Sequence, residues 1–177
     1  MICDWDDFCE SNHRLDLLMQ LHDANPAFRC TLFAIPGLCP ESFLAWLPDW
    51  LELAVHGWMH PDPREAENWT YDQAVAVMGA APDGFVKGFK VPGWQISDDT
   101  YQALIDAGWW CADHPDNNGR RPAGLRAHVC GTGDHWHGHI QNVCGNGLEE
   151  TFPMVLERVR AAESFELISE VVSPCSP

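Results

Sequence analysis

The segment Leu51-Glu-Leu-Ala-Val-His56-Gly-Trp-Met-His60-Pro-Asp62 joins a short apolar run to a pair of histidines. The run itself, residues 51–55, is typical of a strand buried within a parallel sheet. His60 follows His56 at a spacing of four, which lets two imidazoles face one metal ion from a helix or a tight loop. Gly57 and Pro61 disfavour a long helix, and no glutamate follows His56, so the pair is not a zincin motif.

Outward from this segment, strand and helix patterns alternate along the chain. Strands are predicted at 1–5, 30–35, 51–55, 85–89, 109–112, 125–130, 134–142 and 165–172, and helices at 15–22, 41–47, 70–78, 98–107 and 149–162. This order predicts an α/β fold with a parallel sheet or barrel and helices outside it. With 177 residues and no linker or repeat, we expect one domain over 1–177.

Polar side chains gather where the predicted strands end, and this is the edge at which such folds carry their chemistry. The clusters are Asp6 with Asp7, His56 with His60, Lys90, Asp113, and His137 with His139. Five such clusters in succession favour a functional site over ordinary loop residues.

Overall composition narrows the classes of partner. The net charge is −16, from 26 acidic against 10 basic residues, which argues against nucleic acid or anionic membranes as partners. No run approaches the roughly 20 apolar residues of a membrane span, and no signal peptide is evident. The 8 cysteines form no C-x-x-C pair, and Cys3, Cys30 and Cys111 lie in apolar runs. We therefore expect a cytoplasmic protein with reduced thiols; the oligomeric state is left open.

Two histidines need a third ligand to make a metal site, and Asp6 or Asp7 is the nearest source at a strand end. Two histidines and one carboxylate form an open, catalytic type of site for zinc or a related divalent ion. Of two adjacent aspartates, one can bind the metal and the other can act as general base toward a water. The alternative is that both histidines are ordinary loop residues and the aspartates an acidic turn.

A histidine opposite the base could protonate a leaving group. His135, His137 and His139 share one face of their strand because side chains alternate with period two. His137 and His139 are the candidates for this acid. The alternative is that at least two of the three histidines have structural roles. Asp113 could orient the acid through its imidazole, or could be a turn residue.

Two further residues are candidates for the same site. Lys90 could pair with Asp6 and hold it ionised, or could be a surface lysine. Trp94 could be a platform for substrate, or part of the core.

Together these motifs resemble those of the polysaccharide deacetylases with a NodB homology domain, the carbohydrate esterase family 4 superfamily. The resemblance covers about residues 2–140. The matching segments, in order, are Trp5-Asp6-Asp7-Phe8, His56-Gly-Trp-Met-His60, Phe89-Lys90-Val-Pro92-Gly93-Trp94, the looser Trp110-Cys-Ala-Asp113, and Trp136-His137-Gly-His139-Ile.

The resemblance implies a distorted, trimmed (β/α) barrel. It implies that Asp7, His56 and His60 hold a divalent metal, with Zn²⁺ the first choice and Co²⁺, Ni²⁺, Mn²⁺ or Fe²⁺ as alternatives. The implied base is Asp6 and the implied acid His139, with His137 as second choice and Asp113 behind it. Lys90 stands where the family has arginine, Gly57 stands where it often has Ser or Thr, and Trp94 and Pro92 are the implied substrate contacts.

The function expected from these features is a metal-dependent hydrolase that removes an acetyl or other acyl group from an amide nitrogen on a sugar. The substrate would be a glycan or a small N-acylated molecule. Two alternatives remain from other classes: a non-catalytic carbohydrate-binding module, and a structural metal protein, each on the same barrel.

Overall fold

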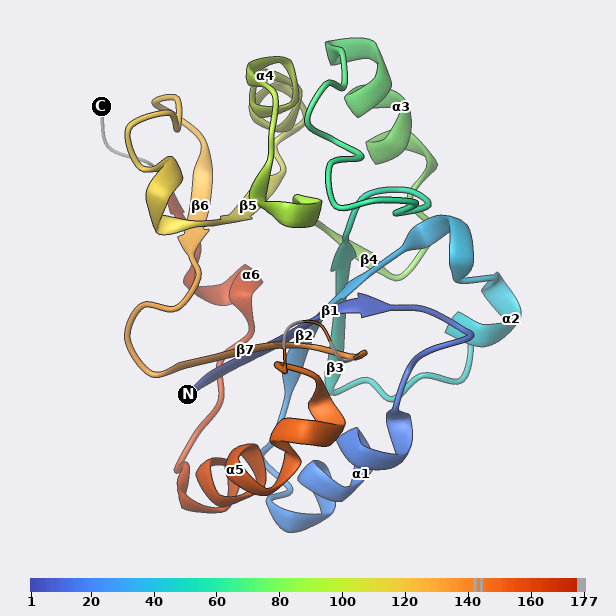
Figure 1. Cartoon of the computed structure of the whole chain (residues 1–177), viewed down its shortest axis with the longest axis vertical. Helices are drawn as coiled ribbons and strands as arrows, with labels where there is room; N and C mark the ends of the chain where they lie inside the picture. The colour runs from blue at the N-terminus through green and yellow to red at the C-terminus, as the bar shows by residue number, and fades with distance from the viewer. Residues whose placement is uncertain (142, 144, 175–177) are drawn as a thin grey trace.

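A computed structural model describes residues 1–141, 143 and 145–174 of the chain. Its strands form one sheet in the order β7-β1-β2-β3-β4-β5-β6-β8. They are β1 (Ile2–Phe8), β2 (Cys30–Ala34), β3 (Leu51–Val55), β4 (Phe85–Lys90), β5 (Trp110–Asp113), β6 (Arg126–Val129), β7 (His135–His139) and β8 (Ser173–Pro174). All neighbouring strands are parallel except β6 and β8, and the sheet curls into a half-barrel (Figure 1).

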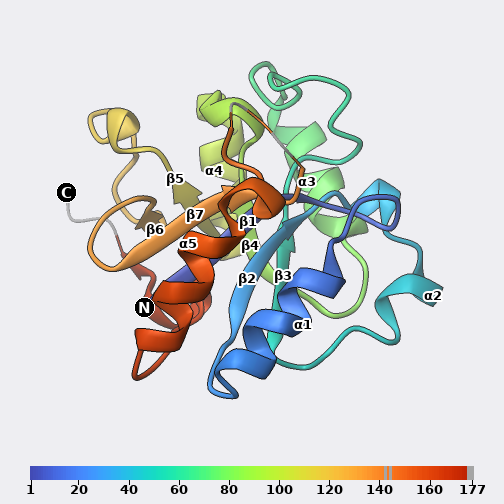
Figure 2. The same ribbon diagram turned by 60° about the horizontal axis from the view of Figure 1, so that its bottom comes forward.

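The longer helices cover the outer face of the curled sheet: α1 (Leu15–Ala24), α3 (Tyr71–Ala80), α4 (Asp98–Ala107) and α5 (Leu148–Ala161). The short helices are α2 (Glu41–Leu44) and α6 (Ile168–Val171), and 3₁₀ turns lie at Pro36–Leu38, Pro92–Trp94 and Pro115–Asn117. Helix α1 packs against α5, and α3 packs against α4 (Figure 2). Local sequence sets their ends: Thr70 caps α3, Ser97 caps α4, and Gly108 ends α4 in the left-handed conformation.

The period-two alternation of the strands sorts side chains between two environments. One set, including Trp5 and Leu32, packs outward under α1 and α5. The opposite set, including Phe33, Ala54 and Trp110, fills the inside of the half-barrel. The inner set turns polar toward the carboxyl ends of the strands, and the candidate site therefore lies inside the curl at that end.

The segment 165–172, predicted as a last strand, is instead an isolated bridge at Glu166 followed by helix α6. Ile168 enters the inside of the half-barrel beside Phe33 and Ala54. Its backbone N–H donates to Thr31 Oγ1 at 3.1 Å, and the buried Glu52 carboxylate accepts from Thr31 and Ser169. Helix α6 thus closes the end of the barrel opposite the site, a tertiary role that the apolar content of the segment does not reveal.

The predicted fold class is confirmed: an α/β, distorted and trimmed (β/α) barrel. The predicted strand 134–142 is shorter, ending at His139, and its residue 142 lies outside the described residues. Within the part of the chain that the structure describes, no helix is long and apolar enough to cross a membrane.

Ile168→Ala should lower the free energy of unfolding by about 2–4 kcal/mol, because it leaves a cavity inside the half-barrel where Ile168 is fully buried. Urea denaturation followed by tryptophan fluorescence measures this. Met154→Ala, on the exposed side of α5, is the control and should change stability by less than about 0.5 kcal/mol. Equal effects of the two substitutions would show that α6 does not seal the barrel.

Candidate active site

The polar side chains at the carboxyl ends of the strands surround a cavity of about 390 Å³. Its wall includes Asp6, Asp7, His56, His60, Trp94 and His139. These residues come from β1, the loops after β3 and β4, and β7, so segments distant in sequence form one site. The structure therefore brings together most of the residues that the sequence predicts.

The end of β1 explains how two adjacent aspartates both reach the cavity. In a regular strand, Asp6 and Asp7 would point to opposite faces of the sheet. Asp7 instead has φ of 65°, and the register between β1 and β2 shifts between Trp5 and Phe8. This irregularity turns the Asp7 side chain to the same end of the barrel as Asp6.

Asp7, His56 and His60 form a compact group whose ligand atoms all lie within 4.8 Å of one another. Asp7 Oδ1 is 3.2 Å from His60 Nε2 and 3.6 Å from His56 Nε2. His56 Nδ1–H donates to the carbonyl oxygen of Lys90 at 2.9 Å, which leaves the Nε2 lone pair directed at the group. Gln141 donates to the other Asp7 oxygen at 3.4 Å.

The ionisation of the group suits a cation. Burial alone would raise the pKa of Asp7, but the hydrogen bond from His60 and the nearby histidines outweigh it and lower this pKa to about 2. Burial lowers the pKa of His56, which favours its neutral form. A carboxylate and a neutral imidazole, together with His60, are the donors that zinc and related divalent ions take, so these residues fit the implied metal.

Glu65 holds the loop that carries the two histidines. Its carboxylate accepts from the backbone N–H groups of Trp58, Met59 and His60 at 2.9–3.0 Å. A Cβ at position 57 would lie 2.1 Å from Glu65 Oε2, and Gly57 has φ of 70°. Gly57 is therefore required here, and Glu65 braces the loop where the family often has a hydroxyl. Sequence analysis missed Glu65, since no short-range spacing marks it.

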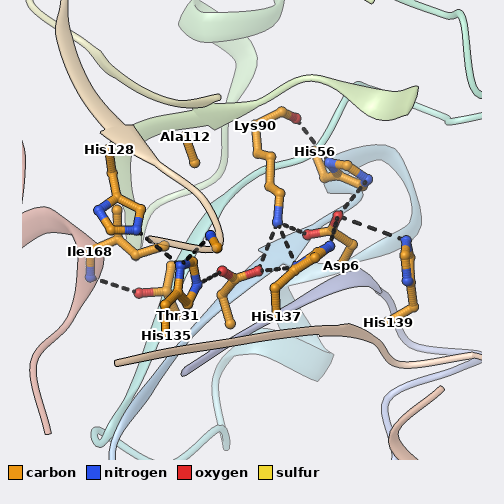
Figure 3. Close-up of polar contacts among 12 residues, drawn as sticks. Asp6, Thr31, His56, Lys90, Ala112, His128, His135, His137, His139 and Ile168 are labelled. Atoms are coloured by element: carbon orange, nitrogen blue, oxygen red, sulfur yellow. Dashed lines mark hydrogen bonds and ion pairs between the residues drawn. The ribbon is translucent and has the colours of Figure 1, made fainter. Parts of the chain in front are cut away.

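Lys90 is fully buried and lies between two carboxylates of β1. Its Nζ is 2.7 Å from Asp4 Oδ1 and 2.8 Å from Asp6 Oδ1, and it also lies 3.0 Å from His137 Nδ1 (Figure 3). Burial opposes its charge, but Asp4 and Asp6 outweigh that effect and raise the pKa of Lys90. The structure thus places the predicted Lys90–Asp6 pair in contact and adds Asp4, which sequence analysis did not single out.

Asp4 also contacts two histidines of β7. Its Oδ1 is 2.8 Å from His137 Nδ1, and its Oδ2 accepts from His135 Nε2. The register explains this, because β1 and β7 are parallel neighbours with Asp4 opposite His137. Burial would raise the pKa of Asp4, but Lys90 and the two histidines lower it well below its usual value. Asp4 is an ionised carboxylate that can orient His137.

His139 has a different environment. Its Nε2 is 4.0 Å from Asp6 Oδ2, while its buried Nδ1 has no hydrogen-bond partner among the described residues. Burial lowers the pKa of His139 and so favours the neutral imidazole. His137 Nε2 lies 3.9 Å from the same Asp6 oxygen. Asp6, His137 and His139 could together hold a metal as well, but the Lys90 ammonium beside Asp6 disfavours a second cation there.

Asp113 does not orient a β7 histidine through any contact that the structure describes. It accepts from Tyr101 Oη at 2.6 Å, from Asn117 Nδ2 at 2.7 Å and from the N–H of His114 at 2.8 Å. The physical reason is strand parity: Ala112 faces the inside of the barrel, so Asp113 faces α4. Its observed contacts tie β5 to α4 and to the following turn.

Trp94 and Pro92 occupy different places. Trp94 lines the cavity with φ of 62°, its ring 4.9 Å from Lys90 Nζ and 5.7 Å from the His137 ring. Pro92 is buried against Gly57: a Cβ added at position 57 would lie 3.0 Å from Pro92 Cγ. Trp94 thus forms part of the cavity wall, whereas Pro92 packs against the histidine loop.

No protein-family model matches the sequence, and no curated protein is significantly similar to it. Among solved structures, a family 4 carbohydrate esterase from Streptomyces lividans in complex with acetate is 15% identical, with a TM-score of 0.63 over 100% of this chain and 97% of that one. A family 4 acetyl xylan esterase from Clostridium thermocellum in complex with a cobalt ion is 13% identical, with a TM-score of 0.61 over 96% of this chain and 88% of that one.

A third similar structure is a family 4 pseudoenzyme from Bacillus anthracis. It is 14% identical, with a TM-score of 0.61 over 96% of this chain and 64% of that one. These likenesses confirm the resemblance to carbohydrate esterase family 4 at the level of the fold. Because a pseudoenzyme shares this fold, the chemistry has to be argued from the residues of the site.

Glu65→Gln should weaken zinc binding about ten- to a hundred-fold, because it loosens the backbone of the loop that presents His56 and His60. Competition with a chromophoric chelator measures this affinity. The control is Glu67→Gln. The Glu67 carboxylate lies in the same loop but pairs with Arg64, so its loss should leave the zinc affinity unchanged. An unaltered affinity in Glu65→Gln would show that the loop holds its shape without this brace.

Proposed function

We propose that the chain is a metal-dependent hydrolase that removes an acetyl or related acyl group from the nitrogen of a sugar or another N-acylated molecule. One observation carries this proposal: Asp6 Oδ2 lies between a metal-ligand group and a histidine paired with a carboxylate. It is 3.9 Å from His56 Nε2 on one side and 3.9 Å from His137 Nε2 on the other. Asp6, the cation site and His139 line one cavity, and His137 lies beside Asp6.

The metal would be held by Asp7, His56 and His60. When bound, a divalent ion lowers the pKa of a coordinated water and polarises an acyl oxygen. Zinc is proposed first on the strength of the two-histidine, one-carboxylate donor set, with cobalt, nickel, manganese and iron as alternatives.

Asp6 is proposed as the general base. Lys90 holds its Oδ1, which leaves Oδ2 facing the cavity to accept a proton from the attacking water. The contact with Lys90 Nζ at 2.8 Å fixes the Asp6 side chain, so Oδ2 is already directed into the cavity before substrate arrives. The water oxygen then bonds to the acyl carbon, and the bond from that carbon to nitrogen breaks.

We assign the acid to His137 in preference to His139, which the sequence analysis put first. Asp4 Oδ1 lies 2.8 Å from His137 Nδ1 and orients the ring, so that Nε2 faces Asp6 and the reacting centre. His139 lacks such a carboxylate on its Nδ1 among the described residues. His137 would give its Nε2 proton to the departing amine, so the products are a carboxylic acid and an amine.

Substrate contact is proposed for Trp94. Its ring forms part of the cavity wall, and a flat apolar surface there can stack on the face of a sugar ring. One of the solved structures with this fold is an acetyl xylan esterase, a name that indicates a glycan substrate for that protein. This likeness supports the proposal of a glycan substrate here. A non-catalytic carbohydrate-binding module is the alternative, for which the pseudoenzyme on the same fold is a precedent.

The function is tested by acetate release from a panel of N-acetylated sugars and O-acetylated xylan, with zinc-loaded protein and with protein stripped by a chelator. Zinc-loaded protein should release acetate from an N-acetylated substrate, and stripped protein should not. Asp6→Asn should lower kcat at least a hundred-fold while zinc still binds. Full activity in Asp6→Asn would refute the assigned base, and release by neither form from any substrate would favour the binding module.

The acid assignment is tested by comparing His137→Gln with His139→Gln. His137→Gln should lower kcat about a hundred-fold or more on an amide substrate, because the amine leaves poorly without a proton. The loss should be smaller on a substrate whose leaving group needs no protonation, such as an activated aryl acetate. If His139→Gln shows this leaving-group dependence instead, the acid is His139.

Asp4 is tested as a positioning residue against Asp113. Asp4→Asn should lower kcat about ten- to a hundred-fold with little change in KM, because the carboxylate that orients the His137 ring is lost. Asp113→Asn should reduce the melting temperature through its contacts with Tyr101 and Asn117, yet leave kcat of the folded protein unchanged. The reverse pattern would return the orienting role to Asp113.

A further inference from the structure

The half-barrel has an open seam, defined here as the boundary between β7 at one edge of the sheet and β6 with β8 at the other. Within the described residues, no backbone pairing joins β7 to β6 or β8. A parallel barrel closes through hydrogen bonds between its first and last strands. Here, side chains have to bridge the seam.

Three side chains at the seam are potential metal ligands: His128 of β6, Cys130 just after it, and His135 of β7. All are buried, with 8%, 5% and 8% of their surface exposed, and their ligand atoms lie within 4.8 Å of one another. Figure 3 shows His128 and His135 with their rings together, on the opposite side of Lys90 from His56 and His139. The group is separate from Asp7, His56 and His60.

The spacing of the two imidazoles fits a zinc ion. With bonds of about 2.0–2.1 Å and tetrahedral angles, two nitrogens on one zinc lie about 3.3 Å apart. His128 Nε2 and His135 Nδ1 are 3.2 Å apart, joined by a hydrogen bond that a metal ion would replace. A cysteine as the third donor matches the ligand types of protein zinc sites.

The surroundings of His135 are those of a metal ligand. Its Nε2 contacts the buried Asp4 carboxylate, which would fix Nε2–H and turn the Nδ1 lone pair toward His128 and Cys130. Histidines that bind metals commonly donate their other N–H to a carboxylate in this way. The N–H of Gly131 also donates to Nδ1 at 2.9 Å, and metal binding would replace that hydrogen bond. Gly131 lies in the exposed turn between β6 and β7, so this exchange needs only a local adjustment.

We propose that His128, Cys130 and His135 form a second metal site, which takes a thiophilic divalent ion such as zinc and joins the two edges of the open barrel. The Cys130 thiolate would offset part of the ion's charge, and Asp4 would offset the nearby Lys90 ammonium. The described residues supply three donors, and a water molecule would complete the tetrahedron. Neither the fold nor the hydrolase proposed above assigns a role to this group.

Cobalt is the probe, because a thiolate bound to Co²⁺ gives a charge-transfer absorption in the near ultraviolet and the Asp7, His56, His60 group has no thiolate. The full chain, stripped by a chelator under reducing conditions, should take up two equivalents of Co²⁺ and show this band. Cys130→Ser should take up one equivalent and lose the band. Cys39→Ser, which removes an equally buried thiol beside the carbonyl of Phe8, should keep both.

His60→Gln separates the two sites. This variant should take up one equivalent of Co²⁺ instead of two and should keep the thiolate charge-transfer band. Zinc should still raise its melting temperature. That increase should vanish in the double variant with His128→Gln, a readout that does not depend on how well Cys130→Ser folds. A wild-type chain with one equivalent and no band overturns the second site, as does a band that survives Cys130→Ser. Loss of hydrolysis alone bears only on the first site.

Discussion

The buried ammonium of Lys90 is the interaction on which the site depends. A fully buried cation is tolerated only where opposite charges and hydrogen bonds surround it. Asp4 accepts a hydrogen bond from Lys90 Nζ at 2.7 Å, and Asp6 forms an ion pair with it at 2.8 Å. Because both aspartates lie on β1 and Lys90 ends β4, the pair of contacts sets how those strands meet across the inside of the barrel. The two carboxylates that contact this ammonium have different surroundings. Asp4 is enclosed and contacts histidines, while Asp6 keeps one oxygen toward the cavity.

Much of this arrangement could be predicted from the sequence because it depends on short-range rules. The alternation of strands and helices predicts a parallel sheet or barrel, and the family resemblance selects the barrel. The position of polar residues after strands indicates the end at which they meet. Side chains along a strand also alternate between its two faces. Asp113 follows Ala112, which faces the inside of the barrel, and Asp113 therefore faces α4. This alternation also marks Asp4, two residues before Asp6 and therefore on the same face, as a residue that sequence analysis could have found.

Other features lie beyond short-range reasoning because they depend on tertiary contacts. The turn of Asp7 into the site needs a positive φ that the letters Asp-Asp do not encode. Glu65 reaches back to three backbone N–H groups of a loop whose shape is known only once it folds. The segment at 168–171 has strand-like residues, yet it forms a helix because Ile168 fills the barrel and Thr31 and Glu52 bind its backbone and Ser169.

Trimming the barrel has a cost at the seam, since strands at both edges lose the hydrogen bonds that closure would give them. The chain places buried polar groups there instead, and Asp4 connects them to the site: one of its oxygens contacts His135 at the seam and the other contacts His137 beside Asp6. Any ion or proton that changes the charge on His135 therefore acts on the carboxylate that orients His137. In the proposed mechanism, the open edge of the sheet and the acid are therefore linked through this one buried carboxylate.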